Sequence, residues 1–199
     1  MTSTTLHEST MVDHESTTSY AIANWFISRS WQENKPLVHD QIQCLVYLAY
    51  GWYYAIYGIR LFGDPIVAGN RGPIIESLYG IFHKYRTRPI NKKAEECFVN
   101  VNGRIEKREC VIIVPESDLP HPYAVNERRQ VERNIEKILE CVWQECSKIS
   151  AEQSLYLVTR NGTPWQKIAS QYGSNGLRMP IDPDEIYDYF VKTLPTKKQ

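Results

Sequence analysis

The segment from Asp40 to Tyr57 constrains the fold more than any other part of the chain. Its apolar residues recur at intervals of three and four, which places them on one face of a helix. They are Ile42, Leu45, Val46, Ala49, Trp52, Tyr53 and Ile56. Gly58 follows where a helix end favours a residue that tolerates positive φ. The pattern predicts a helix buried in a protein core, because the apolar run is too short to span a bilayer.

Apolar spacing and helix-start signals predict further helices along the chain. The first begins after Thr18, and another is expected to open at Pro73, since proline suits the first helical position. A long helix is expected over residues 126–147, with charges of alternating sign on its outer face. Gln166 is expected to complete a capping box with Thr163. The residues expected to cap the later helices are Ser150, Thr163 and Asp182.

Residues 97–114 have the pattern of a small antiparallel sheet inserted between helices. Cys97–Val101 is rich in β-branched and aromatic residues, and Asn102-Gly103 is the strongest two-residue signal for a hairpin turn. The stretch Arg104–Arg108 is polar, and the apolar run Cys110–Val114 is expected to complete the sheet. The fold class expected is therefore mainly α, with about six to seven helices and one small β segment.

One domain is expected over residues 19–194. Residues 1–18 are dominated by Ser, Thr, Glu and His and contain too few apolar residues to offset the entropy of ordering, so we expect a disordered N-terminal tail. Residues 195–199 are expected to fray. We find no signal-peptide pattern and no disulfide or zinc spacing among the five cysteines, which favours a cytoplasmic protein with reduced thiols and no membrane span.

The charge balance and the motifs narrow the classes of function. The chain has 23 Lys and Arg against 23 Asp and Glu, which argues against a nucleic-acid-binding protein but leaves room for a local basic patch. No P-loop, dinucleotide fingerprint or His-Glu-x-x-His motif is present. Cys44 is expected to be buried, and His39, five residues earlier, is poorly placed to contact it on a helix. We therefore predict no catalytic residue, cofactor or metal ligand.

Three blocks of sequence stand out by their order and spacing. They are Leu45–Trp52 with Gly58 and Leu61-Phe62; Pro65–Ala68 with Gly72-Pro73, Tyr79 and Phe82; and Leu155 with Thr159–Trp165. Together these blocks resemble the SocA-like, or Panacea, antitoxin domain, a family also described as phage-associated or GepA-like proteins. The resemblance covers roughly residues 20–192, with the β segment lying between the matched blocks.

The chain departs from the pattern of this family at three positions. The changed residues are Gly69, Arg160 and Ile74, where relatives often have Trp, His and Val respectively. Any contact that the Trp or the His makes with a partner in relatives would be altered here, and partner choice would differ. The fold is affected less, because the helix starts and the apolar stripes remain.

The resemblance implies a protein that neutralises a cognate toxin by binding it directly. One branch of the family works instead as an adaptor that delivers its toxin to a cytosolic AAA+ protease, and here the tail of residues 1–18 would engage that protease. A nucleic-acid-binding regulator is a third hypothesis, which the charge balance disfavours. The family has no established catalytic residues to carry over.

Two segments are the candidates for the partner-binding surface. Their residues are Asn70, Arg71, Gly72, Pro73, Thr159, Arg160 and Trp165. Gly72-Pro73 has a plainer interpretation as a loop that starts a helix, and Trp165 is either a core residue or a binding anchor. Tyr50, Tyr54 and Tyr57 share one side of the core helix, where either other helices cover them or a partner binds.

Overall fold

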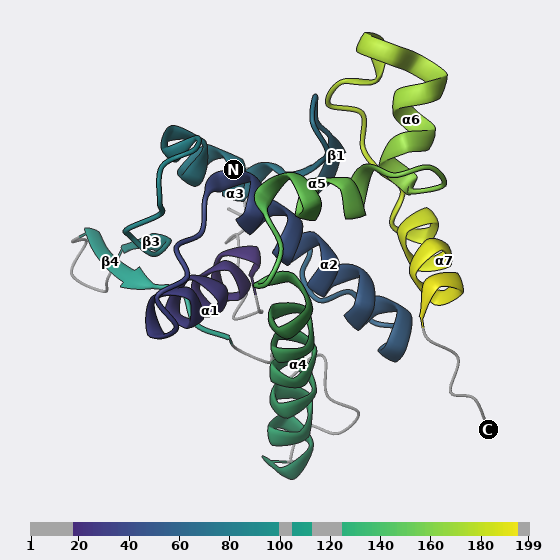
Figure 1. Cartoon of the computed structure of the whole chain (residues 1–199). Helices are drawn as coiled ribbons and strands as arrows, with labels where there is room; N and C mark the ends of the chain where they lie inside the picture. The colour runs from purple at the N-terminus through teal and green to yellow at the C-terminus, as the bar shows by residue number, and fades with distance from the viewer. Residues whose placement is uncertain (1–17, 100–104, 113–124, 195–199) are drawn as a thin grey trace, which may run out of the picture.

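The computed structural model describes residues 18–99, 105–112 and 125–194 (Figure 1). Within these residues the chain forms seven α-helices and two short antiparallel strand pairs, which confirms the mainly α fold with a small β segment. The helices are α1 (Ser19–Gln32), α2 (His39–Tyr57), α3 (Glu76–Phe82), α4 (Val125–Cys146), α5 (Ala151–Thr159), α6 (Pro164–Tyr172) and α7 (Pro183–Thr193). The predicted tail, apart from Thr18, and the predicted frayed end lie outside the described residues.

Helix α2 forms the centre of the fold and packs against α1, α4, α5 and α7 (Figure 1). Five residues of the predicted stripe are buried: Ile42, Leu45, Val46, Ala49 and Tyr53. Trp52 is only half-buried, and Ile56 is 48% exposed, so the prediction for Ile56 is wrong. Periodicity identifies the face of a helix that is buried, but it does not say how far along the helix its neighbours extend. Gly58 ends α2 with a φ of 69°, as predicted.

Helix α7 covers the tyrosine-rich side of α2. The ring of Phe190 lies 5.7 Å from that of Tyr47, and the rings of Tyr54 and Tyr187 are 4.9 Å apart. Tyr50 is buried against Phe62, and Tyr54 and Tyr57 are half-buried. Coverage by other parts of the fold is therefore observed for Tyr50 and in part for Tyr54, whereas Tyr57 stays half-buried and its ring contacts Tyr53 of the same helix.

The predicted hairpin is present, but its second strand lies elsewhere. Strand β3 (Glu95–Val99) pairs antiparallel with β4 (Ile105–Glu109), and Val99 lies opposite Ile105. The polar stretch therefore supplies the second strand, and residues 110–112, the described part of the apolar run, do not belong to it. Cys110 is instead buried, and its carbonyl accepts a hydrogen bond from the Asn24 side chain on α1. The turn itself lies outside the described residues.

A second strand pair replaces the helix start that was predicted at Pro73. Strand β1 (Ile66–Ala68) pairs antiparallel with β2 (Pro73–Ile75), and α3 begins only at Glu76. Proline also suits the first residue of a strand, where the local sequence does not distinguish it from a helix start. The Gly69 N–H donates to the Gly72 carbonyl and closes the turn between the strands.

The other predicted helix starts agree with the structure. Thr18, Ser150, Thr163 and Asp182 each accept a backbone N–H at the start of a helix, and α4 lies within one residue of its predicted bounds. The capping box at Thr163 is only half formed. Gln166 donates its backbone N–H to the Thr163 hydroxyl, but its side chain accepts from Gly162 and not from Thr163.

Candidate functional site

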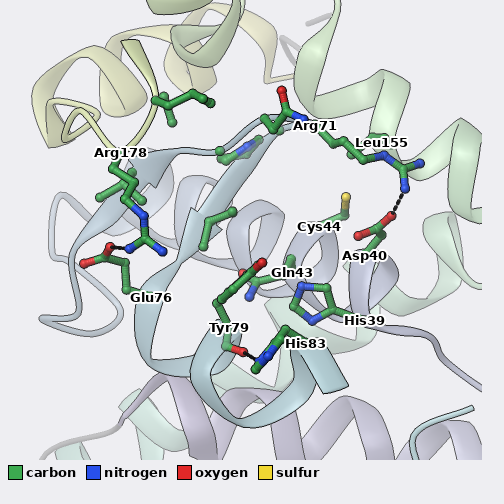
Figure 2. Close-up of a pocket in the computed structure, with 18 of the residues that line it drawn as sticks. His39, Asp40, Gln43, Cys44, Arg71, Glu76, Tyr79, His83, Leu155 and Arg178 are labelled. Carbon is green, nitrogen blue, oxygen red and sulfur yellow. Dashed lines mark hydrogen bonds and ion pairs between the residues drawn. The ribbon is translucent and has the colours of Figure 1, made fainter. Parts of the chain in front are cut away.

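A groove of about 710 Å³ opens between the first turns of α2, the β1–β2 turn, α3 and α5. Figure 2 shows the side chains around it. Helix α2 supplies its floor, and the β1–β2 turn supplies one wall. The segment His83–Thr87, which includes the short 3-10 helix η1 (His83–Tyr85), and Leu177-Arg178 complete the lining. The groove therefore joins segments that lie far apart in the sequence.

One of the two predicted segments lines this groove, and the other supports it from behind. The residues Asn70, Arg71, Gly72 and Pro73 all line the groove. Gly72 is buried against α5, and a Cβ at this position would lie 3.1 Å from Leu155 and 3.4 Å from Thr159. Thr159 bonds the Leu155 carbonyl within its own helix. This close packing fixes the turn against α5.

Trp165 and Arg160 make contacts within the fold. The half-buried indole of Trp165 donates a hydrogen bond of 2.8 Å to the Gly69 carbonyl at the base of the turn. The guanidinium of Arg160 donates to the Tyr189 hydroxyl on α7. Neither side chain lines the groove. Trp165 thus holds the wall of the groove in place.

Two ion pairs stand on opposite sides of the groove (Figure 2). Arg71 lies 2.9 Å from the Asp40 carboxylate, and Arg178 lies 2.9 Å from Glu76. Both arginines are largely exposed, so each pair contributes at most about 1 kcal/mol to stability. The pairs leave the aliphatic stems and the guanidinium edges at the rim, where a partner can contact them.

Gln43 fixes the position of β2 at the floor of the groove. Its side-chain carbonyl accepts the Ile75 N–H at 2.9 Å, and its amide donates to the Ile75 carbonyl at 3.3 Å. The edge of β2 is thereby occupied by a helix side chain instead of a further strand. Because these groups are buried, losing the contacts would leave two unsatisfied backbone groups.

Three rings form a contiguous aromatic wall. Tyr79 contacts His39 edge-on at 5.2 Å and stacks on His83 at 5.1 Å with nearly parallel planes. His39 is buried, with only 7% of its surface exposed, and burial lowers its pKa while the nearby Asp40 carboxylate opposes that shift. Tyr79 is 36% exposed, and His83 is exposed. The wall therefore presents ring faces and edges to any molecule in the groove.

The comparison with protein-family models shows to which family this chain belongs. A family model described as "Antitoxin SocA-like, Panacea domain" matches residues 42–166, more than half of the chain. The chain belongs to the SocA-like antitoxin family. No curated protein and no solved structure matches it.

The Panacea match contains most of the groove, including the β1–β2 turn and Tyr79 of α3. The resemblance that the sequence suggested is thereby confirmed. Sequence reasoning missed His39, Asp40, His83 and Arg178 as groove residues. These residues come to line one groove only through tertiary packing, and their spacing in the sequence does not predict it. Tyr79 could have indicated this site, because it belongs to the second of the three blocks that resemble the family, but no role was predicted for it.

The groove of this SocA-like protein also brings together Cys44, His39 and Asp40, which the sequence did not predict. Burial raises the pKa of the Cys44 thiol well above its usual range, and the Asp40 carboxylate raises it further. Asp40 pairs with Arg71, and the buried Nδ1 of His39 has no hydrogen-bond partner among the described residues, so Asp40 does not orient that imidazole. Within the described residues, the thiol of Cys44 forms no hydrogen bond with the imidazole of His39. A cysteine hydrolase needs a thiolate, a base that is hydrogen-bonded to it and an acid that orients the base. The contacts of Cys44, His39 and Asp40 do not provide this arrangement.

Among the described residues, no group of three or more His, Cys, Asp or Glu side chains is placed to hold a metal ion. Within the same ranges, no helix is both long enough and apolar enough to cross a bilayer.

Proposed function

We propose that this SocA-like protein neutralises a cognate toxin in the cytoplasm by binding it directly, with the groove as the docking surface. The observation that carries the proposal is the combination of exposed Tyr79, Arg71 and Arg178 around one concave site. Tyrosine and arginine are the residue types that most often dominate binding energy at protein interfaces. Membership of an antitoxin family supports a toxin as the partner.

The rigidity of the groove supports the same role. Trp165 anchors the turn at Gly69, and Gln43 anchors β2 at Ile75, so the walls are held by hydrogen bonds before any partner arrives. A preformed surface loses little conformational entropy on association, which favours tight binding. Inhibition would then follow from occupancy of the toxin, and the dissociation rate would determine its duration.

The direct test is co-expression of the full chain with each neighbouring gene product that arrests growth. We expect one such product to lose its toxicity and to co-purify with the chain. Tyr79→Ala should lower the affinity for that product by about 10-fold or more, as expected for a central aromatic contact. Tyr172→Ala removes an exposed tyrosine outside the groove and should leave affinity nearly unchanged.

Two results would contradict the proposal. Failure of the chain to relieve any neighbouring toxicity would remove the antitoxin role. Equal affinities for Tyr79→Ala and Tyr172→Ala, with both variants folded by circular dichroism, would place the docking surface elsewhere. Deletion of residues 1–17, which keeps the Thr18 cap of α1, tests the mechanism. An occupancy inhibitor should keep full activity, whereas an adaptor that uses this tail should no longer deliver the bound partner for degradation.

A further inference from the structure

One stretch of this electrically neutral chain has no acidic residue. No Asp or Glu occurs between Glu76 and Glu95, although the whole chain has equal numbers of positive and negative side chains. The cations in this stretch are Lys84, Arg86, Arg88, Lys92 and Lys93. The stretch is therefore a local basic patch, which the overall charge balance conceals.

The five cations divide into a paired and an unpaired group. Lys92 pairs with Glu95 at 3.0 Å, and Lys93 pairs with Glu109 at 2.6 Å, so both are neutralised by the hairpin. Lys84, Arg86 and Arg88 are exposed, and none of them forms an ion pair with a described carboxylate. We call residues 83–88 the basic segment. Its positive charge is available to a partner.

The basic segment is continuous with the groove. His83, Arg86 and Thr87 line the groove and also a neighbouring hollow of about 540 Å³, which Lys84 and Arg88 help to form. The remaining charges of the groove lining are Asp40, Glu76, Arg71 and Arg178, and these four form two mutual ion pairs. The sign of the local potential is therefore set by the basic segment.

The backbone at Arg86 does not account for an arginine at that position. Arg86 has a φ of 51° and a ψ of −112°, a conformation that glycine adopts far more readily than a residue with a side chain. It is held there by hydrogen bonds from the His39 N–H to the Arg86 carbonyl and from the Arg86 N–H to the His83 carbonyl. Glycine would fit the turn better, so the backbone conformation gives no reason for an arginine here, and its exposed side chain lines the groove.

We propose that the basic segment receives an acidic segment of the toxin, whose carboxylates contact Lys84, Arg86 and Arg88 while an adjacent apolar side chain enters the groove. This inference rests on the proposed function, because it concerns the part of the toxin that binds to the groove. The apolar side chains of Val67, Ile74, Leu155 and Leu177 line the groove. A nucleic acid would need an extended cationic track for its phosphates, whereas this surface combines a short cluster of cations with an apolar slot.

The test compares matched charge reversals in the full chain, using the neighbouring gene product whose toxicity the wild-type chain relieves. Lys84→Glu/Arg88→Glu should weaken binding by about 10-fold or more and should remove most of the salt dependence measured between about 50 and about 200 mM NaCl. Lys148→Glu/Lys192→Glu makes the same change in net charge at exposed positions outside the groove and should change affinity by less than about twofold.

Arg86→Gly provides a second variant that separates binding from folding. It removes one cation and relieves the unfavourable φ, so its midpoint of thermal unfolding should not fall while its affinity for the toxin does. A lower affinity with unchanged stability supports the proposal. Unchanged affinity in both this variant and Lys84→Glu/Arg88→Glu would overturn it.

The outcomes distinguish this proposal from the proposed function. If the wild-type chain relieves no toxicity, both are wrong. If the wild-type chain and the double reversal neutralise the toxin equally well, only the acidic partner segment is wrong. A labelled single-stranded RNA and a labelled DNA duplex serve as the second probe. Saturable binding of either probe that the double reversal abolishes, with toxin binding unchanged, would assign the basic segment to nucleic acid and overturn the proposal.

Discussion

The indole N–H of Trp165 donates a 2.8 Å hydrogen bond to the backbone carbonyl of Gly69. This contact joins the first turn of α6 to the β1–β2 turn, across nearly a hundred residues of sequence. Gly69 is buried, and a side chain at this position would collide with Ile74 and with the Gly72 carbonyl. The groove wall therefore depends on a tryptophan that does not line the groove.

We expect Trp165→Phe to lower the free energy of unfolding by about 1–3 kcal/mol, because the buried Gly69 carbonyl loses its donor. Urea unfolding measures this loss. Trp31→Phe is the matched control, since that indole is 44% exposed and its bond to the Ile90 carbonyl is 3.3 Å long. Its loss should be below about 1 kcal/mol. Equal losses in the two variants would show that the hydrogen bond to Gly69 contributes little.

The sequence predicted those features that depend on neighbouring residues. The caps at Ser150 and Asp182 and the end of α2 at Gly58 follow from side chains and backbone preferences within one helical turn, and all three are confirmed. The family resemblance identified the turn at residues 70–73, and the structure places that turn in the groove. Whether these residues bind a partner stays a prediction.

The rest of the groove could not be predicted, because it depends on contacts between distant residues. Pro73 has the local properties of a helix start, and only the pairing of β2 with β1 and the clamp from Gln43 select the strand. The edge-on contact of Tyr79 with His39 likewise exists only after α2 and α3 have packed. The spacing of apolar residues predicts which face of a helix is buried, but it does not predict which residues of other elements pack against that face.

Gly51 allows α7 to approach α2, and this contact gives a second stability prediction. A Cβ at Gly51 would overlap the Phe190 ring, so Gly51→Ala should destabilise the fold by about 1–3 kcal/mol through overpacking. This loss outweighs the gain of about 1 kcal/mol that alanine has over glycine in a helix. Chemical denaturation measures the difference.

Two further variants identify the cause of that loss. Gly80→Ala in α3 meets no atom within 4 Å and should leave stability unchanged or raise it by up to about 1 kcal/mol. In Gly51→Ala/Phe190→Leu, the smaller side chain relieves the overlap, so the combined loss should be less than the sum of the single losses. Additive losses would mean that the Phe190 ring is not the obstacle.

His39 gives a prediction for the pH dependence of stability. Burial lowers its pKa below the ordinary value of about 6.5, against the opposing effect of Asp40, and the neighbouring His83 lowers it further. Below about pH 6.5 the unfolded chain therefore binds a proton that the folded chain rejects. The free energy of unfolding should fall as the pH drops through this range and should reach its full value above it.

Urea unfolding at about pH 5.5 and about pH 7.5 measures this dependence in the wild-type chain and in His39→Gln. The variant should show a smaller difference between the two pH values, because the buried imidazole is absent. His83→Gln is the comparison variant and should reduce the wild-type difference only slightly, because burial, and not the exposed His83 ring, is the largest cause of the lowered pKa of His39. An unchanged difference in His39→Gln would assign the pH dependence to other groups.

Chemical modification tests whether the thiol of Cys44 in the groove is reactive. Burial raises the pKa of this thiol far above neutral pH, and the reactive form of a cysteine is the thiolate. We expect a thiol reagent at neutral pH to modify the exposed Cys141 first, and to reach Cys44 only after denaturant is added. Mass spectrometry of digested protein identifies the order of modification.

Cys44→Ala completes this test, because it removes the thiol and keeps the helix. The variant should neutralise the toxin as well as the wild-type chain does, since the proposed contacts are with Tyr79, the exposed cations and the apolar walls of the groove and not with the buried sulfur. Rapid modification of Cys44 in the folded protein, together with loss of activity in Cys44→Ala, would contradict this expectation. Such a result would mean that the contacts of Asp40 rearrange to activate the thiol, and a catalytic role for the groove would then have to be considered.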